Sequence, residues 1–191
     1  MKPFTEIAHD HVRAVLRPGD MAIDATVGNG HDTIFLAECV GPEGNVFGFD
    51  VQPDVLERTA QRLVARNLHN VTLFHRSHAE MRMALPHMES GRVRAVMFNL
   101  GYLPGVDKSI TTDAESTITA IRHSVELLGA GGILTVLAYV GHSGGLAEAD
   151  AVKRLLRQLP NEEFNVNEEA APPDRTAPPR LFVVRRREQA R

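Results

Sequence analysis

The sequence predicts an α/β protein with a Rossmann-like, three-layer architecture. Helices should cover both faces of a seven-stranded sheet with six parallel strands and one antiparallel strand. Three observations lead to this prediction. Short apolar runs alternate with amphipathic segments of helical period along most of the 191 residues. A glycine-rich turn separates the first run from the helix after it. The last two strand-like runs have no helix between them.

The chain begins with an amphipathic segment and then alternates strands with helices. The N-terminal helix is expected at about Thr5 to Leu16, where apolar residues recur at helical spacing. Strands are expected at 21–25, 45–50, 71–75, 93–98 and 132–139, and helices at about 31–40, 53–67, 78–89, 112–129 and 145–159. The glycine-containing stretches 41–44 and 129–132 are expected to close two of the helices. Because strands that alternate with helices form parallel sheets, these five strands should run in one direction.

The end of the chain predicts the antiparallel strand. Residues 163–169 and 181–186 are both strand-like and are joined only by a proline-rich loop. Strands joined without a crossover helix pair antiparallel, so the last strand should be inserted in reverse. The loop at 171–179 should then lie at the same edge of the sheet as the glycine turn.

Length and composition fit a single cytoplasmic domain that spans residues 1–191. Cys39 is the only cysteine, which excludes an intrachain disulfide and favours a reducing compartment. The N-terminal residues have no signal-peptide pattern, and no run approaches the roughly 20 apolar residues of a membrane span. A formal net charge of −3 gives no global attraction to nucleic acid, so an RNA partner would need a local basic surface. The arginines at 180–191 are one candidate, and a solvated charge run is the alternative.

The stretch Asp24-Ala-Thr-Val-Gly-Asn-Gly-His-Asp-Thr33 predicts a site for a nucleotide-like ligand, with Gly28 and Gly30 in the tight turn. A dinucleotide site prefers a small residue where this chain has Thr33, and Asp32 would repel a pyrophosphate at the start of the helix. S-adenosylmethionine (SAM) has a positive ammonium and a positive sulfonium centre instead. Carboxylates at Asp24 and Asp32 suit these charges, so the turn favours SAM over NAD.

Polar residues near the turn complete the predicted cofactor site. Asp50 ends the second strand about 20 residues after the turn, where a carboxylate reaches the ribose of such a ligand. Gln52 is expected to contact the same sugar or the adenine. Asn29 and Asp32 are expected at the amino-acid end of SAM, and capping of the following helix is the alternative role for both.

Two residues after the third strand are further cofactor candidates. His78 is expected to contact the cofactor, because this fold usually places an adenine-binding polar group at that point. Ser77 is also a candidate contact, although its expected main role is to cap the next helix.

The segment Phe98-Asn-Leu-Gly-Tyr-Leu-Pro-Gly105 follows the fourth strand, at the edge where a methyl group would be transferred. Asn99 is expected to accept a hydrogen bond from the target amine, and Tyr102 to stack on the target base. A plain turn with a buried tyrosine is the alternative. His142, in the glycine-rich stretch after the fifth strand, is a candidate proton acceptor, with a passive histidine as the alternative. This chemistry needs no metal ion.

Four strings in the chain resemble a known family: DATVGNGHDT at 24–33, FGFDVQ at 47–52, FNLGYLPGVDKSI at 98–110 and YVGHSGG at 139–145. They are similar to the small class I SAM-dependent methyltransferases of the YtqB and MnmM type, long labelled rRNA methylases. The resemblance covers about residues 4–159. It implies methylation of the aminomethyl group of 5-aminomethyl-2-thiouridine at the tRNA wobble position. The anticodon stem-loop would be the partner and S-adenosyl-L-homocysteine (SAH) the product.

The resemblance also implies roles for individual residues. SAM contacts are implied at Asn29, Asp32, Asp50, Gln52 and His78, and amine contacts in the stretch 99–102. Before its last strand the family usually reads Asn-Asn-Pro-Pro-Phe, whereas this chain reads Thr-Ala-Pro-Pro-Arg at 176–180. The identity of the RNA is therefore left open.

Three alternatives remain beside a tRNA methyltransferase: a methyltransferase of rRNA or another amine, an NAD-type oxidoreductase, and a SAM-binding protein without catalysis. Asp32 and Thr33 disfavour the oxidoreductase, and the Asn99 loop disfavours a non-catalytic protein. The sequence leaves the oligomeric state open, with a homodimer as one alternative.

Overall fold

The structure, a computed structural model, describes residues 2–101, 112–170 and 178–188. Its strands are β1 (Met21–Asp24), β2 (Asn45–Asp50), β3 (Val71–His75), β4 (Val93–Leu100), β5 (Leu128–Ala138), β6 (Phe164–Glu168) and β7 (Arg180–Arg186). Its helices are α1 (Phe4–Arg13), α2 (His31–Val40), α3 (Pro53–Ala65), α4 (Met81–Ala84), α5 (Ala114–Leu127) and α6 (Gly145–Leu156), and the short 3-10 helix η1 (His78–Glu80) precedes α4. In this part of the chain, no helix has the length and apolar character needed to cross a membrane.

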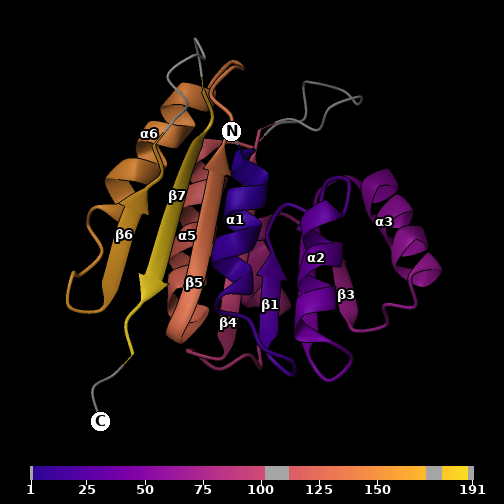
Figure 1. The fold of residues 1–191 in the computed structure, drawn as a ribbon. Coiled ribbons are helices and arrows are strands. Elements are labelled where there is room, and N and C mark those ends of the chain that lie inside the picture. Colours follow the sequence, from indigo (N-terminus) through magenta and orange to yellow (C-terminus); the bar gives the residue numbers. More distant parts are fainter. Residues whose placement is uncertain (1, 102–111, 171–177, 189–191) are drawn as a thin grey trace.

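The seven strands form one sheet in the order β3-β2-β1-β4-β5-β7-β6 (Figure 1). β7 is antiparallel to both of its neighbours, and the other paired strands are parallel. The predicted fold class, including the reversed last strand, is confirmed. The strand order changes direction between β1 and β4, and open α/β sheets bind ligands at the carboxyl ends of the strands beside such a point.

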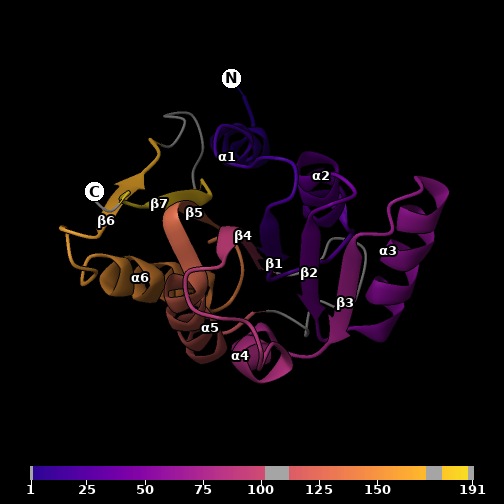
Figure 2. The same cartoon turned by 90° about the horizontal axis from the view of Figure 1, so that it is seen from below.

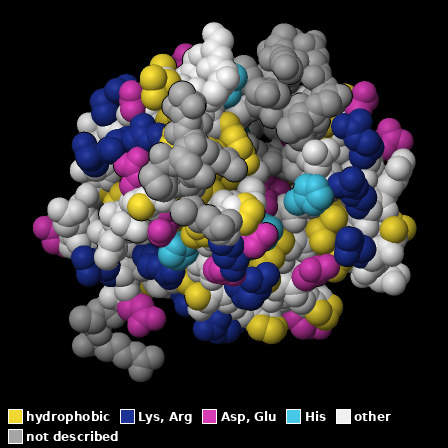
Figure 3. Space-filling view, turned by 45° about the horizontal axis from the view of Figure 1, so that its top comes forward, with side chains coloured by type: hydrophobic (Ala, Val, Ile, Leu, Met, Phe, Trp, Pro, Cys, Tyr) yellow, Lys and Arg dark blue, Asp and Glu magenta, His cyan; other side chains and the backbone are white. Residues whose placement is uncertain are grey.

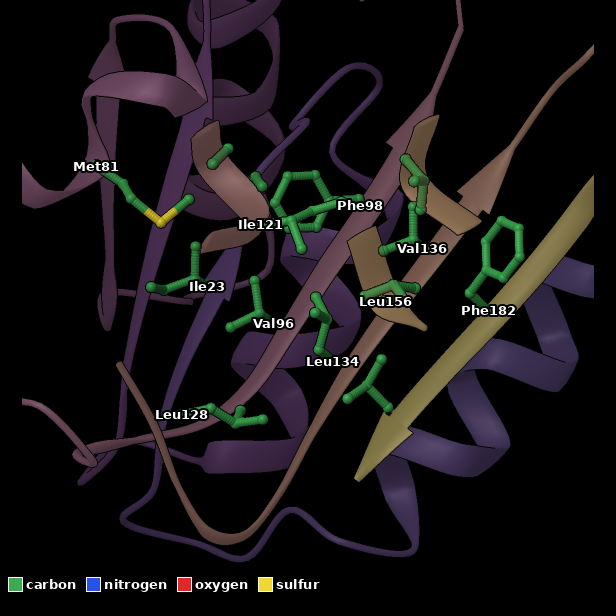
Figure 4. Close-up of a cluster of buried hydrophobic side chains, with 14 of the residues drawn as sticks. Ile23, Met81, Val96, Phe98, Ile121, Leu128, Leu134, Val136, Leu156 and Phe182 are labelled. Carbon is green, nitrogen blue, oxygen red and sulfur yellow. The ribbon is translucent and has the colours of Figure 1, made fainter. Parts of the chain in front are cut away.

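Helices cover both faces of the sheet (Figure 2). α1 and α2 lie on one face and α5 and α6 on the other, while α3 packs against β2 and β3. Ile23 and Phe98 belong to the core that includes residues of α5 and α6, shown in Figure 4, whereas Ala22 and Met97 belong to the core on the α1 and α2 side. Because both faces are buried, the central strands are apolar throughout instead of alternating with polar residues.

The helix expected at 78–89 is wrong in length and regularity. The chain forms η1 and then α4, which ends at Ala84. Pro86 explains this end, because a proline disfavours helical geometry in the residue before it, and Leu85 has φ −119° and ψ 57°. α1, α5 and α6 also end two or three residues earlier than expected.

The glycine run 129–132 lies inside a strand and does not follow a helix end as expected. α5 ends at Leu127 and β5 begins at Leu128, and both leucines are fully buried. A Cβ atom on Gly129 would lie 2.6 Å from the carbonyl oxygen of Gly91. The glycines therefore allow a close backbone approach where the register between β4 and β5 shifts.

Candidate functional site

A cavity of about 730 Å³ lies at the carboxyl edge of the sheet, beside the change of direction between β1 and β4. Segments that follow all five parallel strands from β1 to β5 line it. The predicted site residues on its wall are Gly28, Asn29, Asp32, Asp50, Gln52, Ser77, His78, Asn99 and His142. Of the other predicted residues, Asp24 and Gly30 do not line the cavity, and Tyr102 lies outside the described residues.

The glycine turn between β1 and α2 forms one wall of the cavity. Gly28 and Gly30 have φ of 47° and 74°, a region that glycine adopts without strain. A Cβ atom on Gly30 would lie 2.7 Å from the side chain of Thr59, so α3 packs directly against the turn. Gly30 is the N-cap residue of α2. Among the described residues, no side chain accepts a capping hydrogen bond from the N–H groups at the start of this helix. The capping alternative for Asn29 and Asp32 is therefore wrong, and both line the cavity.

Asp50 connects the end of β2 to the glycine turn. Its Oδ2 accepts a hydrogen bond from the N–H of Gly28 at 2.9 Å, and its Oδ1 accepts one from the N–H of Gln52 at 2.9 Å. Each carboxylate oxygen can accept a second hydrogen bond. Asp50 is thus fixed in orientation and still able to bind hydroxyl groups in the cavity.

Asp24, at the end of β1, is fully buried beneath the turn. It accepts hydrogen bonds from the Thr33 hydroxyl at 2.5 Å and the N–H of Thr26 at 3.1 Å. Burial, together with the negative charge of Asp32, raises the pKa of Asp24 to about 7. Thr33 therefore has a structural role, because its hydroxyl group donates to the buried carboxyl of Asp24.

Replacing Asp24 with asparagine should change the pH dependence of stability. Because the pKa is raised above its ordinary value of 3.8, the folded state binds more protons than the unfolded state between about pH 4 and pH 7. The wild type should therefore lose stability as the pH rises through this window, by up to about 1.4 kcal/mol per pH unit. Urea unfolding at several pH values should show that the free energy of unfolding falls less with rising pH in Asp24→Asn than in the wild type. Parallel curves for the two proteins would contradict this expectation.

His78 is 7% exposed and packs against the ring of Phe98. Its Nδ1 donates to the carbonyl oxygen of Ala25 at 3.1 Å, because a carbonyl can only accept. Burial lowers the pKa of the ring, so the neutral form is favoured and its Nε2 is an acceptor. Ser77 caps η1 by accepting from the N–H of Ala79 at 3.2 Å, which confirms its predicted capping role.

Asn99 lies near the end of β4 with its main chain fixed. Its N–H donates to the Thr26 hydroxyl at 2.7 Å, which links the loop after β1 to the loop after β4. Asn99 lines the cavity, as predicted for a residue that contacts a bound substrate.

Glu148 of α6 stabilises the backbone on both sides of segment 102–111, and sequence reasoning missed it. Gly101 and Thr112 are hydrogen-bonded to each other at the base of this segment. The hydroxyl groups of Thr112 and Thr117 donate to Glu148 at 2.9 and 2.7 Å, although these threonines lie 36 and 31 positions away in sequence. Glu148 is 3% exposed, but its local sequence is that of an ordinary helix, so no local signal could have predicted the contact.

Asp113 lines the cavity, and sequence reasoning missed it as well. It is the N-cap of α5 and accepts from the N–H groups of Glu115 and Ser116. The hydrogen bond from the Ser116 hydroxyl lowers the pKa of the Asp113 carboxyl. An aspartate just before a helix is a recognisable N-cap signal, but the expected helix start at 112 placed Asp113 inside the helix.

His142 lies in the loop after β5 and lines the cavity. Its Nδ1 donates to the carbonyl oxygen of Ser143 at 3.0 Å, so in the neutral ring Nε2 is the basic nitrogen. A Cβ atom on Gly101 would lie 3.6 Å from this Nε2. His142 is therefore adjacent to Gly101, two residues after Asn99.

The expected rim loop at 171–179 falls mostly outside the described residues, but Pro179 lines the cavity. Its neighbour Arg180 donates to Asp150 and Glu168, at 2.7 Å in each case. These two carboxylates compensate the charge of Arg180, which makes it a poor candidate for binding phosphate.

Comparison with known proteins gives a family match and similar relatives. A family model described as "Putative rRNA methylase" matches residues 46–185. A chloroplastic tRNA (mnm(5)s(2)U34)-methyltransferase of Arabidopsis thaliana is 38% identical over 172 residues, which cover 85% of this chain. The match covers 62% of the plant protein, so this chain spans less than two thirds of that relative's length.

Two crystal structures are similar over nearly their whole length. One, from Clostridium thermocellum and described in the same words as the family, has a TM-score of 0.91 and 38% sequence identity. The match covers 97% of this chain and 98% of that one. The other, a "putative methyltransferase" from Streptococcus mutans in complex with SAH, has a TM-score of 0.85 and 34% identity. That match covers 97% of this chain and 99% of the Streptococcus chain.

Proposed function

This chain belongs to the rRNA methylase family, and we propose that it transfers a methyl group from SAM to the aminomethyl nitrogen of 5-aminomethyl-2-thiouridine at the tRNA wobble position. The observation that supports this most strongly is a single cavity that brings Asp32 and Asp50 together with Asn99. The names of the Arabidopsis and Streptococcus relatives support the tRNA substrate and the cofactor respectively.

The cavity residues fit SAM, which when bound supplies an electrophilic methyl group on a positively charged sulfur. Asp50 can accept hydrogen bonds from ribose hydroxyl groups at the end of β2. Nε2 of His78 is buried without a hydrogen-bond partner among the described residues, so it can accept from an N–H group of a bound base. Asp32, with Asn29 beside it, supplies a negative charge for the ammonium group of the amino-acid portion.

The acceptor amine must lose a proton before it reacts, because an aliphatic amine is mostly ammonium at neutral pH. The side-chain oxygen of Asn99 accepts a hydrogen bond from the amine and directs its lone pair. Nε2 of His142 takes the proton, since the other ring nitrogen donates to Ser143. Exclusion of water by the cavity walls favours the neutral amine further.

The anticodon stem-loop must be bound by a local basic surface, because the formal net charge is −3. Arg76 lines the cavity, and Arg62 of α3 donates to the carbonyl oxygen of Asn29 in the glycine turn. In Figure 3 the top of the view in Figure 1 is turned forward, and Lys and Arg side chains lie toward the left and the right of this face. Arg76 pairs with one exposed carboxylate, that of Glu80 at 3.2 Å, whereas Arg180 pairs with two at 2.7 Å. These positions support phosphate contacts by Arg62 and Arg76 rather than by Arg180.

Methylation of tRNA that has 5-aminomethyl-2-thiouridine tests the proposed function. Such tRNA, isolated from a strain that lacks this protein, should gain one methyl group at the wobble nucleoside when incubated with the purified protein and SAM. The control is tRNA whose wobble uridine has no aminomethyl group, which should stay unmethylated. A protein that binds SAM but leaves the aminomethyl nucleoside unchanged would contradict the proposed substrate.

Ribosomal RNA is the second candidate substrate, favoured by the family description and by the altered residues before β7. Ribosomal RNA from the same strain belongs in the same assay. Methylation of rRNA but not of tRNA would assign the same site to this second substrate.

A further inference from the structure

Helix α1 contacts the wall of the cavity through His9. Nε2 of His9 lies 2.6 Å from Oδ1 of Asp32, and the two side chains are 21% and 11% exposed. Asp32 lines the cavity, whereas no residue of α1 does. Helix α1, which otherwise covers the sheet, thus contacts the carboxylate that is predicted to bind the ammonium group of SAM.

The imidazole ring of His9 is held in place by packing against Phe35. It stacks on Phe35 of α2 with ring centroids 3.8 Å apart and an interplanar angle of 4°. Arg13, one helical turn further along α1, places its guanidinium 4.9 Å from the centroid of the Phe35 ring. Buried Ala8 and Val12 anchor the helix beneath these contacts. The direction of Nε2 is therefore set by the fold and does not depend on a bound ligand.

The contact has a specific consequence for the Asp32 carboxylate. Donation from Nε2 of His9 occupies one lone pair of Oδ1 and leaves Oδ2 available to a ligand. The negative charge of Asp32 interacts unfavourably with that of Asp24 and contributes to the raised pKa of Asp24. A fixed donor at Oδ1 compensates part of this repulsion and holds the carboxylate in one orientation.

We propose that His9 is a positioning residue of the SAM site: by donating to Oδ1, it orients Asp32 to bind the ammonium group of the amino-acid portion of SAM. The inference rests on the proposed function, because it assumes that SAM is the ligand. It extends the site to α1, whose only sequence signal is an amphipathic helix.

A pair of ligands that differ only in this portion tests the role. SAH contains the amino-acid ammonium, whereas 5′-methylthioadenosine has the same nucleoside and sulfur without it. His9→Phe keeps an aromatic ring against Phe35 but has no donor for Asp32. Calorimetric titration should show about ten- to a hundredfold weaker SAH binding by this variant, the range expected for a hydrogen bond to a charged group. Binding of methylthioadenosine should stay within about twofold of wild type, since it has no group that contacts Asp32.

Two further variants give the rescue and the matched control. His9→Gln restores an N–H donor at the position of Nε2, so it should bind SAH more tightly than His9→Phe does. His11→Ala changes a histidine on the same helix whose contacts are Glu169 and Arg185, and it should leave both affinities unchanged. In an Asp32→Ala background, His9→Phe should have no further effect on SAH binding.

The outcomes separate this inference from the proposed function. Wild-type SAH affinity in His9→Phe, or an equal loss for both ligands, would overturn the positioning role, because a purely structural defect does not discriminate between them. A wild-type protein that binds neither ligand would instead contradict the proposed function. Thermal unfolding of each variant shows whether it is folded. If His9→Phe is unfolded, His9→Leu gives the same test, because leucine also has no donor for Asp32. Wild-type SAH affinity, or an equal loss for both ligands, overturns the role there too.

Discussion

Replacement of Asn99 with alanine is expected to slow methyl transfer by roughly a hundredfold or more, because misplacing a reacting atom by about an ångström can cost that much. The dissociation constant of SAM should stay within a few fold of wild type. The main chain of Asn99 donates to Thr26, and alanine retains this contact, so the backbone at the end of β4 should not move. Only the side-chain oxygen proposed to align the amine is lost.

Single-turnover methylation of aminomethyl-bearing tRNA, run beside a SAM titration, measures both quantities. Asn99→Asp is the matched variant: its carboxylate can still accept a hydrogen bond, but its charge favours the unreactive ammonium form of the substrate. It should therefore retain part of the activity and gain rate as the pH rises. An alanine variant that transfers methyl groups at the wild-type rate would make Asn99 a turn residue only.

Replacement of Asp50 with alanine is expected to weaken SAM binding by roughly ten- to a hundredfold, the effect of losing one hydrogen bond to a charged group. The structure adds a second reason. Asp50 accepts from the N–H groups of Gly28 and Gln52, so its removal also loosens the glycine turn that lines the cavity.

Titration calorimetry with SAM, SAH and NAD measures this effect and tests the choice of cofactor together. Asp54→Ala is the control, because Asp54 is an exposed carboxylate near the start of α3 that does not line the cavity. It should bind SAM as the wild type does. Wild-type SAM affinity in Asp50→Ala would remove the ribose contact from the site, and tighter binding of NAD than of SAM would contradict the cofactor assignment.

Local sequence patterns were sufficient to predict the sheet and the place of the cavity. Apolar runs such as 93–98 became central strands, and the missing crossover helix before β7 predicted its reversed direction. The cavity position follows from the same pattern, since the carboxyl ends of parallel strands meet at one edge. The errors occur where a local signal was ambiguous, as at Pro86 and in the glycine run 129–132.

The sequence by itself determined the type of fold, the cofactor class that the glycine turn favours, and most of the polar residues predicted at the carboxyl edge. Only the tertiary structure decided what each of these residues contacts. Asp24, Asp32 and Asp50 are the same residue type near the same turn, yet Asp24 is sealed against Thr33, Asp32 contacts His9, and Asp50 joins two backbone N–H groups. The physical reason is that backbone periodicity is a local property, whereas the burial and partners of a carboxylate depend on helices that pack there from elsewhere in the chain.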